Sequence, residues 1–195
     1  MKRVNQREEC LNMQIVDLDR QDKELREQAA EVLVAAFAEH YPGSWDSIEE
    51  AREEVAECLA PDMIFQVALD DNGRLLGWVG GRPEYDGNVW ELHPMAVHPN
   101  AQGKGIGRAL VAKLEEQVKL RGGLTITLGA DDVSNQTSLS GIDLYPNVLG
   151  HLQQIRNINR HQFTFYEKCG FVITGIMPDA NGFGKPDIFM GKRVQ

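Results

Sequence analysis

The stretch HPNAQGKGIGRAL, which begins at His98, constrains most strongly what this chain can fold into. It follows a run of residues typical of a strand and leads directly into a run typical of a helix. Its three glycines are Gly103, Gly105 and Gly107. Glycines let the backbone approach a ligand closely, and the free N–H groups and the dipole at a helix start favour an anion. The stretch therefore predicts a phosphate-binding loop; the alternative is a glycine-rich turn that only begins a helix.

Three kinds of phosphate loop compete for this stretch. A P-loop requires GxxxxGK followed by Ser or Thr, which this stretch lacks. A dinucleotide-binding fingerprint requires GxGxxG, whereas here the third glycine comes one residue early and no acidic residue follows at the expected distance. The remaining pattern is Gln/Arg-x-x-Gly-x-Gly/Ala, which Gln102, Gly105 and Gly107 match. Lys104 and Arg108 add positive charge beside it.

The rest of the chain predicts an α/β domain. Apolar or alternating runs predict strands at residues 13–18, 63–69, 74–81, 89–97, 124–130, 171–177 and 186–194. Helical periodicity predicts helices at residues 21–40, over SWDSIEEAREEVAECLA, from the glycine loop to Arg121, and over HQFTFYEKCG. This order predicts one domain over residues 13–195 with a mixed, mostly antiparallel sheet flanked by helices, a flexible tail at 1–12 and a long insertion at about 131–160.

Two local signals set expected boundaries within this domain. Ser47 and Glu50 form a capping box, which predicts a helix start. Asn72-Gly73 predicts a two-residue hairpin turn with positive φ at both positions.

Composition limits the partners. Lys and Arg number 20 against 29 Asp and Glu, so the net charge is −9. This balance disfavours a nucleic-acid-binding surface and suits a cationic partner. The alternative is that the acidic surface serves only to keep the protein soluble. Three cysteines without metal-like spacing predict neither a disulfide framework nor a metal site. The longest apolar run, VLVAAFA, is too short to span a membrane, and the start lacks a secretory pattern. We expect a cytoplasmic protein without a membrane partner.

Three motifs stand out along the chain: WELHPMAVHP, the glycine loop and FYEKCGF. Together they resemble the GNAT family of N-acetyltransferases over roughly Met13 to Val194. The resemblance implies that the loop holds the pyrophosphate of acetyl-coenzyme A, the cosubstrate, and that backbone groups of the preceding strand bind the pantetheine arm and polarise the thioester carbonyl. The coenzyme-binding residues it implies are Met95, Ala96, Val97, Gln102, Gly103, Lys104, Gly105, Ile106, Gly107 and Arg108.

Further segments of the chain are distinctive: WELHP, RGGLTITLGADD, TSLS, DLY, FYEKCGF and NGFGKPDIFM, together with the long insertion. They resemble the aminoglycoside 6′-N-acetyltransferases of the chromosomal enterococcal type. It implies acetyl transfer to a primary amine of an aminoglycoside, antibiotic resistance and a homodimer. The sequence departs from this type at three positions. Phe37 stands where the type tends to carry a substrate-stacking Trp, and Ser134 and Gly184 stand where it can carry acidic residues.

Three residues are candidates for the chemistry. An ammonium must lose a proton before it attacks a thioester, and Glu91 on a predicted core strand is the candidate acceptor. His93 shares its face on a regular strand and is expected to orient Glu91 or relay a proton. Tyr166 stands where the family's tyrosine faces the coenzyme sulfur and is expected to protonate the departing thiolate. The structural alternatives are a partnered charge for Glu91, a satisfied histidine for His93 and a core aromatic for Tyr166.

The acceptor site should be anionic because aminoglycosides carry several ammonium groups. The predicted substrate-binding residues are Phe37, Tyr85, Glu91, Asp131, Asp132 and Asp187. Tyr85, Asp131 and Asp132 lie at strand ends, where α/β clefts commonly open. Asp187 belongs to the KPDI segment, where a structural role is the alternative.

Two other functions remain open at this point. One is acetylation of a different amine: a polyamine, a peptide N-terminus or a lysine. The other is a coenzyme A-binding module without turnover, against which Glu91, Tyr166 and the complete glycine loop argue.

Overall fold

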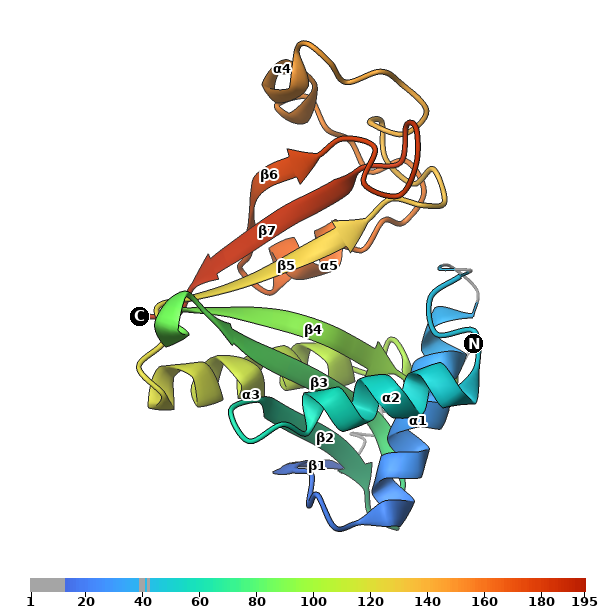
Figure 1. Cartoon of the computed structure of the whole chain (residues 1–195), viewed down its shortest axis with the longest axis vertical. Helices are drawn as coiled ribbons and strands as arrows, with labels where there is room; N and C mark the ends of the chain where they lie inside the picture. The colour runs from blue at the N-terminus through green and yellow to red at the C-terminus, as the bar shows by residue number, and fades with distance from the viewer. Residues whose placement is uncertain (1–12, 39–40, 42) are drawn as a thin grey trace, which may run out of the picture.

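A computed structural model describes residues 13–38, 41 and 43–195, and its centre is a seven-stranded sheet in the order β1-β2-β3-β4-β5-β7-β6 (Figure 1). The strands are β1 (Met13–Asp17), β2 (Ile64–Asp70), β3 (Leu75–Glu84), β4 (Val89–Val97), β5 (Thr125–Asp131), β6 (Val172–Met177) and β7 (Asp187–Arg193). Neighbouring strands are antiparallel except β4 and β5, which are parallel. The predicted α/β class and mostly antiparallel sheet are confirmed. The predicted tail at 1–12 lies outside the described residues.

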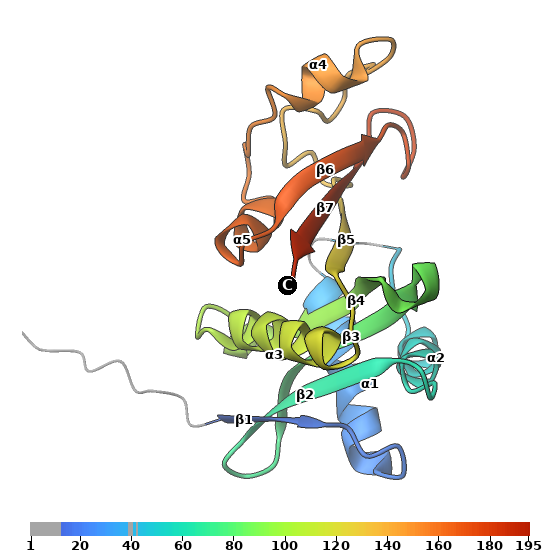
Figure 2. The ribbon, with the colours of Figure 1, turned by 90° about the vertical axis from the view of Figure 1, so that its left-hand side faces the viewer.

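The helices cover both faces of this sheet (Figures 1 and 2). They are α1 (Lys23–Phe37), α2 (Ile48–Cys58), α3 (Ile106–Leu120), α4 (Val148–Leu152) and α5 (Phe163–Lys168), with short 3-10 turns η1 (Tyr85–Gly87) and η2 (Pro99–Ala101). Helices α1 and α2 pack on one face around Trp78, and α3 and α5 pack on the other around Leu114 and Ile126. The sheet therefore separates two hydrophobic cores.

Local signals explain where two elements begin. The Ser47 hydroxyl accepts a hydrogen bond from the Glu50 N–H at 3.2 Å, which confirms the predicted cap of α2. The hairpin between β2 and β3 is also confirmed, but the two-residue turn is wrong. Only Gly73 of the pair has positive φ, at 78°. The Asp70 carboxylate accepts from the N–H groups of Asn72 and Arg74, so it stabilises a longer turn than Asn-Gly alone predicts.

Strand β4 separates from β5 after the first third of its length. The parallel pairing runs from Val89↔Thr125 to Glu91↔Thr127 and then stops. Beyond Glu91 the two strands diverge, as Figure 1 shows. Pairing with β3 continues to Val97, with a register shift between Val79 and Gly81. Backbone groups of β4 after Glu91 therefore have no β5 partner and face an opening in the sheet.

The irregularity sits at Pro94, as the sequence predicts. Leu92 belongs to the core on the α3 side, and Met95, three residues later, packs against that same core. A regular strand would place residues an odd number apart on opposite faces, so one residue is bulged between them. The backbone at this point is tightly enclosed, because a Cβ added at Gly80 would lie 2.2 Å from the His93 carbonyl oxygen.

The predicted insertion contains one short helix, α4, and folds over the β5–β7 end of the sheet (Figures 1 and 2). Buried Asp132 organises its start. It accepts hydrogen bonds from the N–H groups of Gln136 and Thr137 and from the Ser140 hydroxyl. Among the helices of the described ranges, none is long and apolar enough to cross a membrane.

Candidate active site

A cleft of about 730 Å³ opens where β4 leaves β5. Its walls come from the end of α1, from β4, from the glycine loop, from the insertion and from α5. The lining side chains and glycines are Ala36, Phe37, Tyr41, Met95, Val97, Ala101, Gln102, Gly103, Gly105, Ile106, Gly107, Arg108, Gln136, Arg160, Gln162, Phe165, Tyr166 and Lys168. Helices α1 and α5 belong to opposite faces of the sheet, yet both line this cleft. The opening therefore connects the two faces.

The glycine loop is held in the conformation that a phosphate site needs. Gly103 and Gly105 have φ of 74° and 87°, and Gly105 caps the N-terminus of α3. An added Cβ would meet nothing within 4 Å at either position, so the space beside them is open. The Gln102 amide donates to the Val97 carbonyl at 3.1 Å and ties the loop to β4. Free N–H groups at this helix start thus face the cleft with a favourable dipole.

Eight of the ten predicted coenzyme-binding residues line the cleft. Ala96 does not, because the bulge turns it into the core on the α1–α2 side, where it is 1% exposed. Lys104 also lies outside the lining, and its ammonium donates to the Asn100 carbonyl at 2.9 Å. Gly107 needs its small size for a different reason: a Cβ there would lie 3.2 Å from the Phe165 ring of α5. The loop and α5 therefore approach closely across the cleft.

Glu91 is the last residue of β4 that pairs with β5. Its face of the strand is opposite to that of buried Trp90 and Leu92. The side chain is 28% exposed, and one carboxylate oxygen lies 3.6 Å from the Arg82 guanidinium on the adjacent β3. Sequence reasoning missed Arg82, which pairs with Glu91 directly across the two strands. Glu91 is thus a partnered yet accessible carboxylate beside the opening.

His93 lies on the same face but contacts a different carboxylate. Its Nε2 is 3.5 Å from Glu54 on α2, and the Trp45 indole donates to the other Glu54 oxygen at 3.3 Å. Trp45 in turn packs edge-on against Phe37, with ring centroids 4.6 Å apart. Sequence reasoning missed Glu54 and Trp45. The predicted orientation of Glu91 by His93 stays a prediction, since the structure pairs His93 with Glu54.

Tyr166 on α5 combines a buried ring with a place in the cleft lining. The residue is 6% exposed and packs edge-to-face on Phe165 and Phe171. Burial raises the pKa of its phenol, and nearby Tyr41 raises it further. Since the pKa lies above its ordinary value, the hydroxyl remains protonated at neutral pH. It is available as a proton donor to a ligand in the cleft.

Carboxylates gather at the ends of β5 and β7. Asp131 and Asp187 are directly opposite each other in the strand register. Asp131 accepts from the Asn181 amide at 2.5 Å, whereas Asp187 Oδ1 is buried without a hydrogen-bond partner among the described residues. Burial raises the pKa of Asp187 to about 6, and the charges of Asp131 and Glu91 contribute. These three carboxylates form an acidic group, which favours a cation between the strand ends.

Two predicted substrate residues do not face this site. Asp132 is fully buried, and its oxygens accept bonds from the insertion, so we assign it a structural role. Burial opposes its charge, but these hydrogen bonds lower its pKa overall. Tyr85 is 75% exposed in η1, at the start of β4, and outside the cleft lining. Tyr85 thus lies at the opposite end of β4 from the opening, and its contact with a substrate stays a prediction.

Across residues 13–38, 41 and 43–195, no three His, Cys, Asp or Glu side chains are grouped so that they could hold a metal ion.

Comparisons with known proteins agree with this geometry. The model of the acetyltransferase (GNAT) family matches residues 27–151. A crystal structure of an aminoglycoside 6′-N-acetyltransferase complexed with coenzyme A is 38% identical, with a TM-score of 0.84, over 93% of this chain and 97% of that one. The aminoglycoside 6′-N-acetyltransferase from Enterococcus faecium is also 38% identical, with a TM-score of 0.83 over the same shares of both chains.

Curated relatives carry another name. A mycothiol acetyltransferase of Mycobacterium avium is 31% identical over 138 residues, which are 68% of this chain and 40% of that protein. A mycothiol acetyltransferase of Stackebrandtia nassauensis is 27% identical over 135 residues, which are 68% of this chain and 42% of that protein. The chain thus spans less than half the length of these curated relatives. The family model and the solved structures agree on the central point: the chain belongs to the GNAT family of acetyltransferases.

Proposed function

We propose that this protein transfers an acetyl group from acetyl-coenzyme A to the 6′ amine of an aminoglycoside. The observation that carries the proposal is the opening between β4 and β5, which begins directly after Glu91. It joins the glycine-loop cleft on one side to an acidic group on the other. The 38% identity to two aminoglycoside 6′-N-acetyltransferases over nearly the whole chain supports the same acceptor.

The coenzyme half of the site follows from backbone geometry. Its pyrophosphate accepts hydrogen bonds from N–H groups at the start of α3, and Arg108 adds positive charge in the cleft wall. The pantetheine arm runs along β4 at Met95 and Val97, whose β5-facing backbone groups have no strand partner. An N–H aimed at the thioester oxygen stabilises the developing oxyanion by about 3 kcal/mol.

The chemical step needs three proton movements. Glu91 accepts a proton from the acceptor's ammonium, directly or through water, and the free amine attacks the thioester carbon. The C–N bond forms, the attacking nitrogen releases its second proton to water as the C–S bond breaks, and the coenzyme leaves as a thiolate. Tyr166 donates its proton to that thiolate from the α5 side of the cleft. The acetylated amine and free coenzyme A are the products.

The acceptor half follows from charge. Glu91, Asp131 and Asp187 present carboxylates beside the opening, and Phe37 offers an aromatic face in the cleft wall. A polycation with several ammonium groups satisfies more than one of these carboxylates at once. A ring system can pack on Phe37 in the way that a flexible linear amine does less well.

A second candidate is acetylation of a different amine by the same mechanism. The curated relatives named mycothiol acetyltransferases support this second candidate, although they match over less than half of their own length. The acidic group accommodates either acceptor. A homodimer also stays a prediction, which light scattering on the purified protein would test.

The test is thiol release from acetyl-coenzyme A with kanamycin, tobramycin and spermidine in parallel, followed by location of the acetylated nitrogen by NMR. We expect turnover on the aminoglycosides at the 6′ amine. Turnover on spermidine alone would contradict the acceptor and leave the reaction intact. Coenzyme binding without turnover on any of the three would contradict the proposed activity.

A further inference from the structure

His161 is a buried histidine that the proposed mechanism does not use. It lies two residues ahead of α5 and is 1% exposed. Its Nε2 lies 3.2 Å from the carbonyl oxygen of Asp131, at the end of β5. Its Nδ1 lies 3.2 Å from the backbone nitrogen of Phe163, the first residue of α5. One imidazole ring therefore connects a strand end of the acceptor half to the helix that carries Tyr166.

These two contacts determine which ring nitrogen carries the proton. The Phe163 N–H can only donate, so Nδ1 must accept and carries no proton. Nε2 then carries the proton and donates it to the Asp131 carbonyl. Burial lowers the pKa of His161, although the charges of Asp132 and Asp131 oppose this effect, so the ring is neutral at pH 7. Both nitrogens are used within the protein, so the ring is suited to position other groups.

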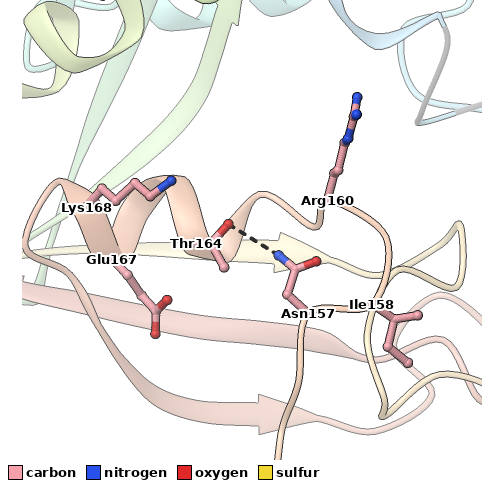
Figure 3. A pocket seen from close by; sticks show the side chains of 6 residues that line it. All are labelled: Asn157, Ile158, Arg160, Thr164, Glu167 and Lys168. Carbon is pink, nitrogen blue, oxygen red and sulfur yellow. Dashed lines mark hydrogen bonds between the residues drawn. The ribbon is translucent and has the colours of Figure 1, made fainter.

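The backbone of His161 is held by the side chain of Asn157. Asn157 Oδ1 accepts from the His161 N–H at 2.9 Å, and its Nδ2 donates to the His161 carbonyl at 2.7 Å and to the Thr164 hydroxyl at 3.2 Å. Figure 3 shows the bond between Asn157 and Thr164, which joins the loop to the first turn of α5. His161 is thus fixed at its backbone and at both ring nitrogens, which makes it a rigid link between β5 and α5.

Helix α5 depends on this link at its start. It spans only six residues, so its own hydrogen bonds stabilise it weakly. Among the described residues, the side chain of its N-cap residue, Gln162, accepts no hydrogen bond from the helix start. The His161 ring takes that role by accepting from the Phe163 N–H. The place of Tyr166 in the cleft wall therefore follows from a ring that is anchored on β5.

We infer that His161 is a positioning residue of the proposed acetyl transfer, which holds Asp131 through Nε2 and the start of α5 through Nδ1. The inference rests on the proposed function. Asp131 belongs to the acidic group of the acceptor half, and Tyr166 lines the coenzyme cleft. The amine, the thioester and the proton donor must meet in one geometry, and a displacement of about 1 Å costs up to about 100-fold in rate. His161 thus sets how the two halves lie relative to each other.

Two variants separate the two arms of the ring, measured by steady-state kinetics with kanamycin and acetyl-coenzyme A. His161→Asn keeps an oxygen that can accept from the Phe163 N–H two residues on, but it is too short to reach the Asp131 carbonyl. Because this variant releases only the strand end, we expect KM for kanamycin to rise about five- to tenfold and kcat to stay within about twofold.

His161→Gln does the reverse. It keeps a donor that can reach the Asp131 carbonyl but lacks an acceptor for the Phe163 N–H, so it releases the start of α5. We expect kcat to fall about five- to tenfold and KM for kanamycin to stay within about twofold. If this loss comes through Tyr166, His161→Gln should cost little further rate in a Tyr166→Phe background.

A second variant tests the helix arm without a change of the ring. Asn157→Asp keeps the acceptor for the His161 N–H but loses the donor to the His161 carbonyl and to Thr164. It should reproduce the fall in kcat of His161→Gln. The stoichiometry of coenzyme A binding, measured by titration calorimetry, counts the folded protein in each preparation, so that a loss of fold is not mistaken for a loss of rate.

Matched controls are His151→Asn and His151→Gln. His151 lies on α4 of the same insertion and outside the cleft lining, so both kinetic constants should stay as in the unaltered protein. The same change of KM and kcat in His161→Asn and His161→Gln would overturn the inference and indicate a purely structural role. Unchanged kinetics in both would overturn it as well. An unaltered protein that binds coenzyme A but acetylates no amine would instead contradict the proposed function, and the inference with it.

Discussion

The two halves of the cleft are constructed in different ways. The coenzyme half comes from one continuous segment, from Met95 to Arg108, and uses backbone N–H groups, positive φ at glycines and a helix start. The acceptor half is assembled from separate elements: Phe37 on α1, Glu91 on β4, Asp131 on β5 and Asp187 on β7, with Glu54 of α2 behind it in contact with His93. Binding in the coenzyme half therefore depends on the shape of the backbone, and binding in the acceptor half depends on the summed charge of the carboxylates.

This difference predicts how each half responds to change. A backbone site has no substitute for a lost conformation, so one bulky side chain should destroy it. Several carboxylates attract a polycationic acceptor together, so removal of one should lower the affinity for that acceptor by only a modest factor. Substitution of a catalytic residue, which acts at a single bond, should have an effect between these two.

The largest effect is expected for Gly105→Val. A β-branched residue at φ 87° strains the turn, and its side chain fills the open space beside the helix start. We expect coenzyme A affinity to fall by about 100-fold or more, since the phosphate loses several N–H donors at once. Titration calorimetry measures it. Gly122→Val is the matched control, because Gly122 has φ of 79° and equally open surroundings at the other end of α3. Unchanged affinity in Gly105→Val would refute the loop assignment.

The next effect is expected for Glu91→Gln. The amide keeps the shape of the side chain but accepts no proton, so kcat/KM on an amine should fall by about 100-fold or more. Coenzyme A affinity should remain, because Glu91 lies outside the residues that line the cleft. Steady-state kinetics and calorimetry separate the two. Glu84→Gln, on the same hairpin and away from the opening, is the control. A normal rate in Glu91→Gln would remove Glu91 from the proposed mechanism.

A smaller effect is expected for Tyr166→Phe. A thiolate is a good leaving group, so loss of the phenol should lower kcat by only about tenfold, at the weak end of general acid catalysis. Because the pKa of Tyr166 is raised, its removal should lower the rate without a shift of the pH profile near neutrality. Tyr145→Phe, which changes an exposed tyrosine of the insertion, is the control. Complete loss of activity would indicate that Tyr166 also positions the thioester.

The coenzyme half could be predicted from the sequence because its signals are local. Gln102, Gly105 and Gly107 lie within six residues and determine their own backbone. Pro94 likewise predicts the bulge in β4, because proline has no N–H to donate to the hydrogen bonds between strands. That same bulge shifts the alternation by one residue, so the Ala96 side chain lies in the core on the α1–α2 side. The local pattern thus predicts the glycine loop, whereas the faces that the side chains take after the bulge are seen only in the structure.

The acceptor half was only partly predictable because it depends on contacts between distant segments. Glu54 belongs to a run of glutamates that reads as a solvated helix face, and only the packing of α2 brings it to His93. Arg82 has no motif, and its pairing with Glu91 follows from strand register. Asp131 and Asp132 are adjacent in sequence, yet one lies at the acidic group and the other is buried under the insertion. Successive side chains of a strand point to opposite faces, so the two aspartates must differ, but the sequence does not say which of them faces the ligand.

The smallest effect is expected for Asp187→Asn, and it has opposite signs for stability and binding. The folded protein raises the pKa of Asp187 from 3.8 to about 6, so ionisation at neutral pH destabilises the fold. The shift corresponds to at most about 3 kcal/mol, and solvent screening of a partly exposed carboxyl reduces it to about 1 kcal/mol. The asparagine should therefore raise the free energy of unfolding at pH 8. This gain should shrink as the pH falls through about 6 and vanish below about 4, where the native carboxyl is already protonated.

Binding should change the other way. Without the Asp187 charge, KM for a polycationic acceptor should rise about three- to fivefold at pH 8, while Glu91 and Asp131 retain the rest of the attraction. Urea denaturation at pH 8 and pH 4 measures the first effect, and steady-state kinetics measures the second. Asp62→Asn, at an exposed turn, is the control for both. A loss of stability at pH 8 would show that the Asp187 carboxylate holds the β5–β7 strand end together, and the acceptor half would then rest on Glu91 and Asp131 alone.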